Sequence, residues 1–200
     1  MSASRASSSP RAPGVPPRGR SGVRVRQAGE DDVPGVVRCL HAAFAPFRSQ
    51  YTAAAYAETT LTRWTALERL RSMRVLVAVD RAGRVLGTVA WVRKPSGIGY
   101  LRGMAVDPRW QGSRVAGRLL NRALADLYAA GARRVTLHTT HPLGRAIGFY
   151  RRNGFRPTGR QGEFFGMETL QFARALTGRK RPSRSRPRRG TGSRARRSSR

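Results

Sequence analysis

A twenty-residue stretch, Leu101 to Leu120 (LRGMAVDPRWQGSRVAGRLL), constrains the fold of this chain more than any other part of the sequence. It begins as an apolar run that predicts a buried strand. The strand is expected to end at Val106, because Asp107 and Pro108 follow and proline has no N–H to donate to a neighbouring strand. Gly112 then lies in a short loop. Beyond the loop, apolar side chains recur at helical spacing, namely Val115, Leu119, Leu120, Ala123, Leu124, Leu127 and Tyr128. The stretch predicts a strand, a turn and an amphipathic helix whose N-terminus suits an anion such as phosphate.

A second segment, Ala146 to Phe155 (AIGFYRRNGF), narrows the interpretation. It resembles the A-x-x-F-Y-x-x-x-G-F signature of the GNAT acetyltransferase superfamily. The upstream loop from Gln111 to Ala116 (QGSRVA) resembles that family's acyl-CoA pyrophosphate loop, Q/R-x-x-G-x-G/A. The two segments occur in the family's order, with a helix and a strand between them, and the resemblance covers Val23 to Ala173.

The resemblance implies an α/β fold: a single GNAT-type domain with a mixed, mostly antiparallel sheet, a splayed parallel pair and flanking helices. It implies acetyl-CoA as acyl donor and transfer of the acetyl group to a primary amine, small molecule or protein, in a ternary complex. It also implies that the splayed strand and the loop bind the cofactor. The cofactor-binding residues would be Met104, Ala105, Val106, Gln111, Gly112, Ser113, Arg114, Val115 and Ala116.

Two positions depart from the family pattern. Arg114 stands where the loop usually has its first glycine. A side chain at this position disfavours a positive φ and a close approach of the cofactor to the backbone, whereas the arginine charge would add a contact to phosphate. Leu143 stands where the family often has an asparagine that touches the cofactor. Both departures favour the alternative function, a GNAT-fold binding module with weak or no catalysis.

Tyr150 matches the family's catalytic tyrosine, which protonates the leaving thiolate. A phenol with a pKa of about 10 is able to protonate a thiolate with a pKa of about 8.5 once the two are held in contact. The group that takes the proton of the acceptor amine stays open among four candidates: Asp107, Glu163, Glu168 and His138.

Other site chemistries find little support in the sequence. The three histidines are scattered and form no metal-ligand motif with cysteines or carboxylates. Cys39, the single cysteine, falls on the apolar face of a predicted helix and is interpreted as a small buried residue. One cysteine fits a reducing compartment, and the sequence lacks a secretory signal and a membrane span, so a cytoplasmic protein is expected.

Charge divides the chain into three parts. The net charge is +30, and half of this excess lies in residues 1–20, with four arginines, and 177–200, with eleven Lys or Arg and no acid. Both segments are rich in Ser, Pro and Arg and are predicted to be disordered tails around a 21–176 acetyltransferase domain. Arginine-rich tails of this kind bind nucleic acid without sequence preference, and in the alternative function they would tether the GNAT-fold binding module to nucleic acid. Solvated tails with no partner are equally consistent with the composition. The oligomeric state is left open.

Hydrophobic patterning predicts the remaining elements. A helix begins at Glu30–Asp32 and ends before Pro46, and a second helical region covers Ala53 to Leu70. A later short helix covers Leu143 to Arg152. The predicted strands other than the central one are Val23–Arg26, Val75–Val79, Val85–Val92, Val135–Thr139, Phe155–Thr158 and Phe164–Phe172.

Overall fold

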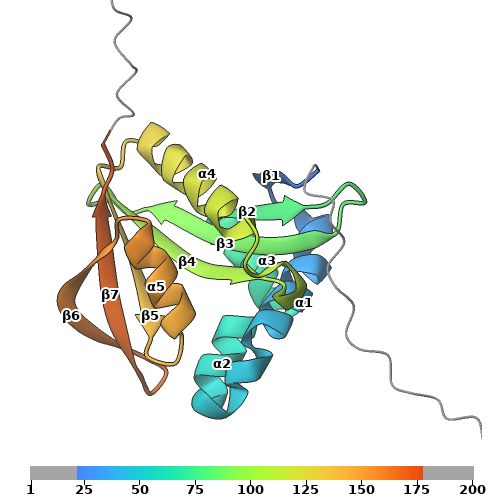
Figure 1. Ribbon diagram of the computed structural model, residues 1–200, viewed down its shortest axis with the longest axis horizontal. Helices are drawn as coiled ribbons and strands as arrows, with labels where there is room; N and C mark the ends of the chain where they lie inside the picture. Colours follow the sequence, from blue (N-terminus) through green and yellow to red (C-terminus); the bar gives the residue numbers. More distant parts are fainter. Residues whose placement is uncertain (1–21, 178–200) are drawn as a thin grey trace, which may run out of the picture.

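A seven-stranded mixed sheet runs through the computed structural model, which describes residues 22–177 (Figure 1). Its strand order is β1-β2-β3-β4-β5-β7-β6. Neighbouring strands are antiparallel except β4 and β5, which are parallel, so the predicted fold class is confirmed. The strands are β1 Arg24–Gln27, β2 Arg74–Val79, β3 Val85–Arg93, β4 Ile98–Val106, β5 Arg134–Thr140, β6 Arg156–Phe164 and β7 Met167–Ala175.

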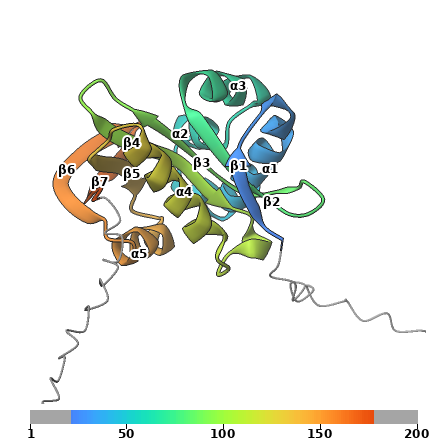
Figure 2. The ribbon, with the colours of Figure 1, turned by 90° about the horizontal axis from the view of Figure 1, so that it is seen from above.

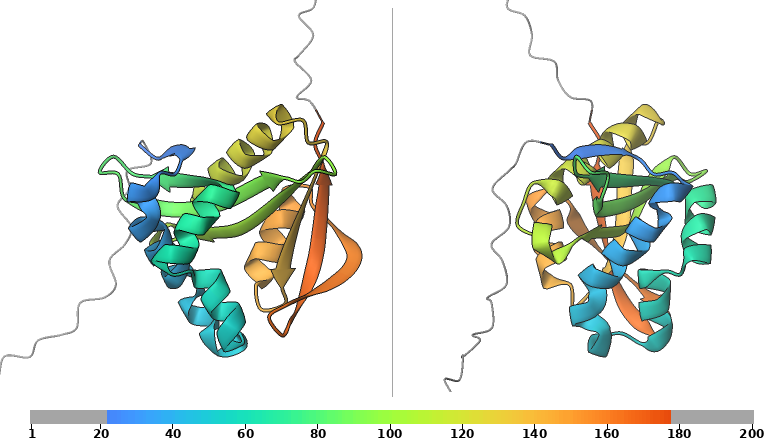
Figure 3. Two further views of the ribbon diagram at one scale, coloured as in Figure 1. Left: turned by 180° about the vertical axis from the view of Figure 1, so that it is seen from behind. Right: turned by 90° about the vertical axis from the view of Figure 1, so that its right-hand side faces the viewer.

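Helices cover both faces of the sheet. One face carries α4 and α5, and the other carries α1, α2 and α3, as the view from above in Figure 2 and the view from behind in Figure 3 show. Strand β2 is buried on both sides: Leu76 packs in the cluster under α4, whereas Val77 packs in the cluster under α1. This explains its continuous apolar sequence. The helices are α1 Val33–Phe44, α2 Ala53–Thr60, α3 Arg63–Ser72, α4 Val115–Ala129 and α5 Gly144–Arg152.

Close contact between α4 and the sheet depends on a residue without a side chain. A Cβ at Gly87 of β3 would lie 2.9 Å from the Ala105 carbonyl oxygen and 3.0 Å from Leu119 Cδ1 of α4. Leu119 itself is fully buried. The central helix predicted from the Val115 to Tyr128 pattern is therefore seated directly on β3 and β4, which fixes the position of its N-terminus.

The second helical region differs from the prediction. Instead of one helix over Ala53 to Leu70, the chain forms α2 and α3, separated at Leu61, which has a φ of 63°. Thr62 begins the second helix, because its Oγ1 accepts a hydrogen bond from the Thr65 N–H at 3.2 Å. The hydrophobic pattern of the sequence did not reveal this break. Helix α1 ends at Phe44, before Pro46 as predicted, and a 3-10 turn follows over Ala45–Gln50.

The last two strands also differ from the prediction. The aromatic pair Phe164-Phe165 favoured a strand from Phe164 to Phe172, but Phe165 and Gly166 form the turn of the β6–β7 hairpin, with φ values of 51° and 80°. Positive φ at both residues is the geometry that a two-residue hairpin turn requires. Strand β6 consequently extends well beyond the predicted Phe155–Thr158.

The two predicted tails lie outside the described residues, apart from Thr177. Leu176, just after β7, still belongs to the folded domain: its side chain is buried, and its N–H donates to the Arg133 carbonyl at 2.8 Å. No helix within residues 22–177 has the length and apolar character needed to span a membrane.

Candidate active site

A bulge in β4 opens the sheet next to the parallel pair. Strand β4 pairs with β5 only over Ile98 to Leu101. Beyond this point the register with β3 shifts, because three steps along β4, from Arg102 to Ala105, match two steps along β3. Gly103, with a φ of 62°, lies within this bulge. Within residues 22–177, the β4 residues after Leu101 pair with β3 alone, and the edge that faces β5 is left open.

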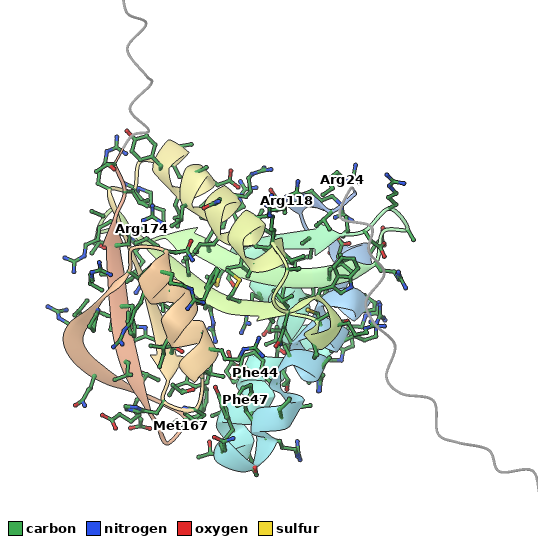
Figure 4. All side chains as sticks on the ribbon, in the orientation of Figure 1. Arg24, Phe44, Phe47, Arg118, Met167 and Arg174 are labelled. Atoms are coloured by element: carbon green, nitrogen blue, oxygen red, sulfur yellow. The ribbon has the colours of Figure 1, made fainter. Side chains whose placement is uncertain are left out.

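A cavity of about 220 Å³ lies at this opening. Strands β4 and β5, helix α5 and the β6–β7 hairpin line one part of it, and side chains from α1, α2, α3 and the turn before α2 line the rest. Figure 4 labels Phe44 and Phe47 in the lower half of the molecule, and Met167 at the start of β7. Phe44 lines the cavity, and the two phenylalanine ring centroids are 6.5 Å apart.

Tyr150 lines the cavity from α5. Its ring packs edge-on against Phe149 and Phe155, with centroid separations of 5.6 Å each. Within residues 22–177 its hydroxyl makes no hydrogen bond, and burial raises the pKa of Tyr150 above its ordinary value. A buried phenol at a cavity wall stays protonated at neutral pH, so Tyr150 has the protonation state that the proposed acid needs.

The loop before α4 carries free backbone donors. In the described part of the chain, the N–H groups of Gly112, Arg114, Ala116 and Gly117 donate to no acceptor, whereas the Val115 N–H donates to Ser113 Oγ at 3.3 Å. Since α4 has 15 residues, these donors lie at the positive end of a long helix dipole. Such an arrangement binds anions.

Gly112, and not position 114, adopts the left-handed conformation in this loop. Its φ is 77°, and no atom lies within 4 Å of the place where a Cβ would be. Arg114 has φ −80° and ψ 3°, which any residue adopts, and its side chain is exposed. The arginine in place of the family's glycine therefore introduces no backbone strain and leaves the loop open to a ligand.

Gln111 holds the loop against its neighbours. Its Nε2 donates to the Val106 carbonyl at 3.2 Å, and its Oε1 accepts from Arg145 Nη1 of α5 at 3.3 Å. Of the three strand residues, Met104 lines the cavity, whereas the side chains of Ala105 and Val106 are buried in the core on opposite faces of β4. Only the backbone of these two residues is available to a ligand.

Leu143 also lines the cavity. It precedes α5 as a backbone cap without a side-chain hydrogen bond, and its N–H donates to the Thr140 carbonyl at 3.1 Å. The leucine contributes an apolar surface where the family often has an amide.

The four candidate bases separate into two groups. His138 and Glu163 line the cavity, but Asp107 and Glu168 do not. Asp107 pairs with Arg109 at 2.8 Å, and this hydrogen-bonded guanidinium lowers the pKa of the Asp107 carboxyl. Glu168 is exposed near His141.

His138 is suited to accept a proton. Partial burial and the Lys94 charge lower its pKa, so the imidazole is neutral at pH 7. Its ring centroid lies 5.8 Å from that of Tyr100, and its Nε2 lies 3.2 Å from Gln171 Nε2. Glu163 Oε1 already accepts the Gly166 N–H of the hairpin turn at 3.1 Å.

Sequence reasoning missed an ionic cluster on the cavity wall. Glu58 Oε1 accepts from Arg102 Nη2 at 2.9 Å and from Arg69 Nη2 at 3.2 Å, and both arginines line the cavity. Arg69 is 8% exposed. Burial and the neighbouring Arg102 lower its pKa to about 10, so it remains charged at neutral pH. An arginine within the apolar run of β4 was the one available signal.

The described residues offer no other reactive centre of these kinds. No group of three or more His, Cys, Asp or Glu side chains is placed to hold a metal ion in residues 22–177. Cys39 is buried, and burial raises the pKa of its thiol to about 12, which leaves the thiol unreactive.

Comparison with known proteins identifies the family. The model of the acetyltransferase (GNAT) family matches residues 37–155. No curated protein matches the sequence at a significant level. Among solved structures, a GNAT-family acetyltransferase from Staphylococcus aureus Mu50 is similar, with 15% identity and a TM-score of 0.66, over 78% of this chain and 99% of that one.

Two further structures are similar at the level of the fold. The PaiA N-acetyltransferase from Thermoplasma acidophilum, solved with coenzyme A, shows 14% identity and a TM-score of 0.64 over 76% of this chain and 98% of that one. A phosphinothricin acetyltransferase from Sinorhizobium meliloti, solved with acetyl-CoA, shows 18% identity and a TM-score of 0.62 over 78% and 89%. With the matched family model and this shared fold, the chain belongs to the acetyltransferase (GNAT) family of acyl-CoA N-acyltransferases.

Proposed function

We propose that this protein transfers the acetyl group of acetyl-CoA to a primary amine that binds in the same cavity. The observation that carries the proposal is the joint placement of Tyr150 and the opened edge of β4 at one cavity, with the donor-rich loop at the end of the same strand. Coenzyme A in the PaiA structure and acetyl-CoA in the phosphinothricin acetyltransferase structure support the choice of cofactor.

Cofactor binding follows from the free donors. The N–H groups of Gly112, Arg114, Ala116 and Gly117 would bind the pyrophosphate, because they lie in the loop and first turn of α4 and have no partner in the described structure. The amides of the pantetheine arm would pair with the open edge of β4 near Met104. Gln111 would keep the loop in position.

The chemical step requires two proton transfers. The neutral amine attacks the thioester carbonyl carbon, a C–N bond forms and the C–S bond breaks. His138 or Glu163 would take the proton lost by the amine, and Tyr150 would give its phenolic proton to the departing thiolate. The products are the N-acetylated amine and the free thiol of coenzyme A.

The first test measures thiol release from acetyl-CoA over a panel of amines and peptides. Release that depends on an amine supports the proposal. A folded protein that releases no thiol with any amine but shifts DNA in a salt-dependent way would support the binding-module alternative.

A loop substitution tests the cofactor site. Gly112→Pro is expected to abolish acetyl-CoA binding in calorimetric titration, since proline removes an N–H and cannot adopt the φ of 77°. Gly159→Pro is the matched control, because Gly159 has a φ of 74° and an equally empty Cβ position but lies on β6 away from the loop. Unchanged affinity in a folded Gly112→Pro protein would exclude this loop as the phosphate site.

A further inference from the structure

We propose that the acceptor amine carries an oxyanion, a carboxylate or a phosphonate-type group, which Arg69 and Arg102 bind at the wall of the cavity. This inference rests on the proposed acetyl transfer, and it assigns the acceptor class that the transfer would use. Neither the family signature nor the loop motif contains these two arginines, which come from α3 and β4.

The donor inventory of the two guanidinium groups supports this assignment. Each guanidinium has five N–H donors. Among the described residues, Arg102 uses only Nη2, on Glu58 Oε1, and Arg69 uses only Nη2, on the Oε1 and main-chain carbonyl of Glu58. The Nε and Nη1 groups of both side chains therefore have no acceptor among the described residues. Both side chains line the cavity, and a planar oxyanion matches the paired donors of a guanidinium.

Charge balance leads to the same ligand. A single carboxylate oxygen of Glu58 contacts two positively charged groups, so one positive charge on this wall is unmatched. With only 9% of its side chain exposed, Arg69 has little water to compensate it. Arg69 shares its carboxylate partner with Arg102, and burying an incompletely compensated charge costs free energy. An incoming oxyanion would offset part of this cost.

Two proton-accepting side chains of the same cavity suit the other end of such an acceptor. Glu163 enters from β6 and His138 from β5, whereas the arginines enter from α3 and β4. A molecule with an amine at one end and an oxyanion at the other would place its amine near the proton acceptors and its oxyanion at the arginines. The cavity thus favours amino acids, their close analogues and peptides with an acidic first residue over simple alkyl amines and polyamines.

The test compares acceptors that differ at one oxyanion: glycine with glycinamide, in which the α-carboxylate is lost, and aspartate with asparagine and glutamate with glutamine, in which only the side-chain carboxylate is lost. Aminomethylphosphonate is the phosphonate arm. The expected result is a kcat/KM about tenfold or more higher for the charged member of at least one pair. A higher kcat/KM for the charged acceptor is a stringent criterion, because the amide in the other acceptor makes the neighbouring amine less basic. The amide-containing acceptor therefore has more of its amine in the neutral, reactive form.

Variants connect the preference to the arginines. Arg102→Gln is expected to reduce the charged-to-neutral ratio toward 1, mainly by raising KM for the charged acceptor, and Arg69→Lys is expected to preserve part of it. Arg71→Gln, an exposed arginine on the same helix as Arg69, is the matched control and should keep the wild-type ratio. Thermal unfolding of each variant checks that the fold is intact.

The outcomes distinguish this inference from the proposed function. Thiol release with equal use of charged and neutral acceptors overturns the inference and leaves acetyl transfer standing. If no amine supports thiol release, acetyl transfer itself is wrong, and calorimetric titration with N-acetylglycine and N-acetylglycinamide, which differ by the one carboxylate, tests the oxyanion site directly. Preferential binding of N-acetylglycine that Arg102→Gln abolishes supports the site, and equal or no binding of the two overturns it.

Discussion

At the scale of single residues, the described structure separates side chains that share a chemistry but not a location. Asp107, Glu163 and Glu168 are all carboxylates near the signature segments, yet only Glu163 reaches the cavity. Asp107 caps the short turn over Pro108–Trp110, where its Oδ1 accepts the Arg109 N–H at 3.0 Å. The number of plausible bases therefore falls because Asp107 and Glu168 do not line the cavity.

Tyr150→Phe tests the acid role at this scale. The substitution keeps the ring between Phe149 and Phe155 and removes only the hydroxyl. Loss of a positioned acid should lower kcat by about 10²–10⁴-fold with little change in acetyl-CoA affinity. Stopped or continuous thiol assays at saturating substrate measure the effect. A variant with near-normal kcat would leave Tyr150 as a packing residue and assign the proton to water.

The pH dependence of kcat adds a second readout for the same residue. The acid must be protonated to act, and burial raises the pKa of Tyr150 above the ordinary value of about 10. Wild-type activity should therefore persist through pH 9 and decline only above about pH 10. The Phe variant should lack this alkaline decline. A wild-type decline centred near pH 8 would point to another titrating group.

At the scale of elements, the start of α1 shows how one carboxylate organises a turn. Asp32 pairs with both terminal nitrogens of Arg26 on β1, at 2.6 and 2.8 Å, and accepts the Gly29 N–H at 2.9 Å. These bonds tie the first strand to the helix that follows it. The hydrogen bond from Arg26, opposed by burial, lowers the pKa of the Asp32 carboxyl below its ordinary value.

Asp32→Asn is expected to reduce the free energy of unfolding by about 1–2 kcal/mol at pH 7. Hydrogen bonds to charged groups contribute somewhat more than this, and the partly exposed Arg26 is screened by solvent. Because the folded pKa of Asp32 is lowered, its stabilising effect is present above the unfolded pKa of about 3.9 and is lost as the pH falls through the folded value. The difference between wild type and variant should narrow below about pH 4.

Urea unfolding at pH 7, 5 and 3.5 measures this difference. Asp31→Asn is the control, since Asp31 lies in the same acidic turn, is exposed and makes no side-chain hydrogen bond within residues 22–177. It should change stability by at most a few tenths of a kcal/mol. Equal losses in the two variants at pH 7 would show that the turn's overall charge, and not the Arg26 contact, matters.

At the scale of the whole molecule, the cavity is assembled from segments that lie far apart in the sequence. Thr52 Oγ1 before α2 donates to the Phe165 carbonyl in the β6–β7 turn at 2.6 Å, and Tyr51 Oη lies 2.7 Å from Thr140 Oγ1 of β5. These contacts join the α1–α2 segment to the last strands on either side of the cavity. Its wall therefore forms only when both ends of the described chain are in place.

The basic C-terminal segment provides the prediction at this scale. Deletion of residues 178–200 removes eleven of the 40 basic residues and no acidic one. It keeps Leu176, which closes the core. Turnover of a small amine should stay near wild type, whereas any DNA binding should weaken and show a shallower dependence on salt. Gel-shift titrations at several salt concentrations, with thiol assays on the same samples, measure both. A folded truncation without turnover would place the segment in the active site.

The sequence alone determined the fold class and the order of most elements, because these depend on local properties, and it predicted the cofactor loop. Apolar periodicity defined α4 and the strand before it, and the loop from Gln111 to Ala116 with the Tyr150 segment carried the family resemblance. Tertiary structure decided the rest. The bulge at Gly103, the turn at Phe165-Gly166 and the break at Leu61 arise from strand register and packing. The Glu58 cluster needs three residues from α2, α3 and β4, a contact that no spacing along the chain encodes.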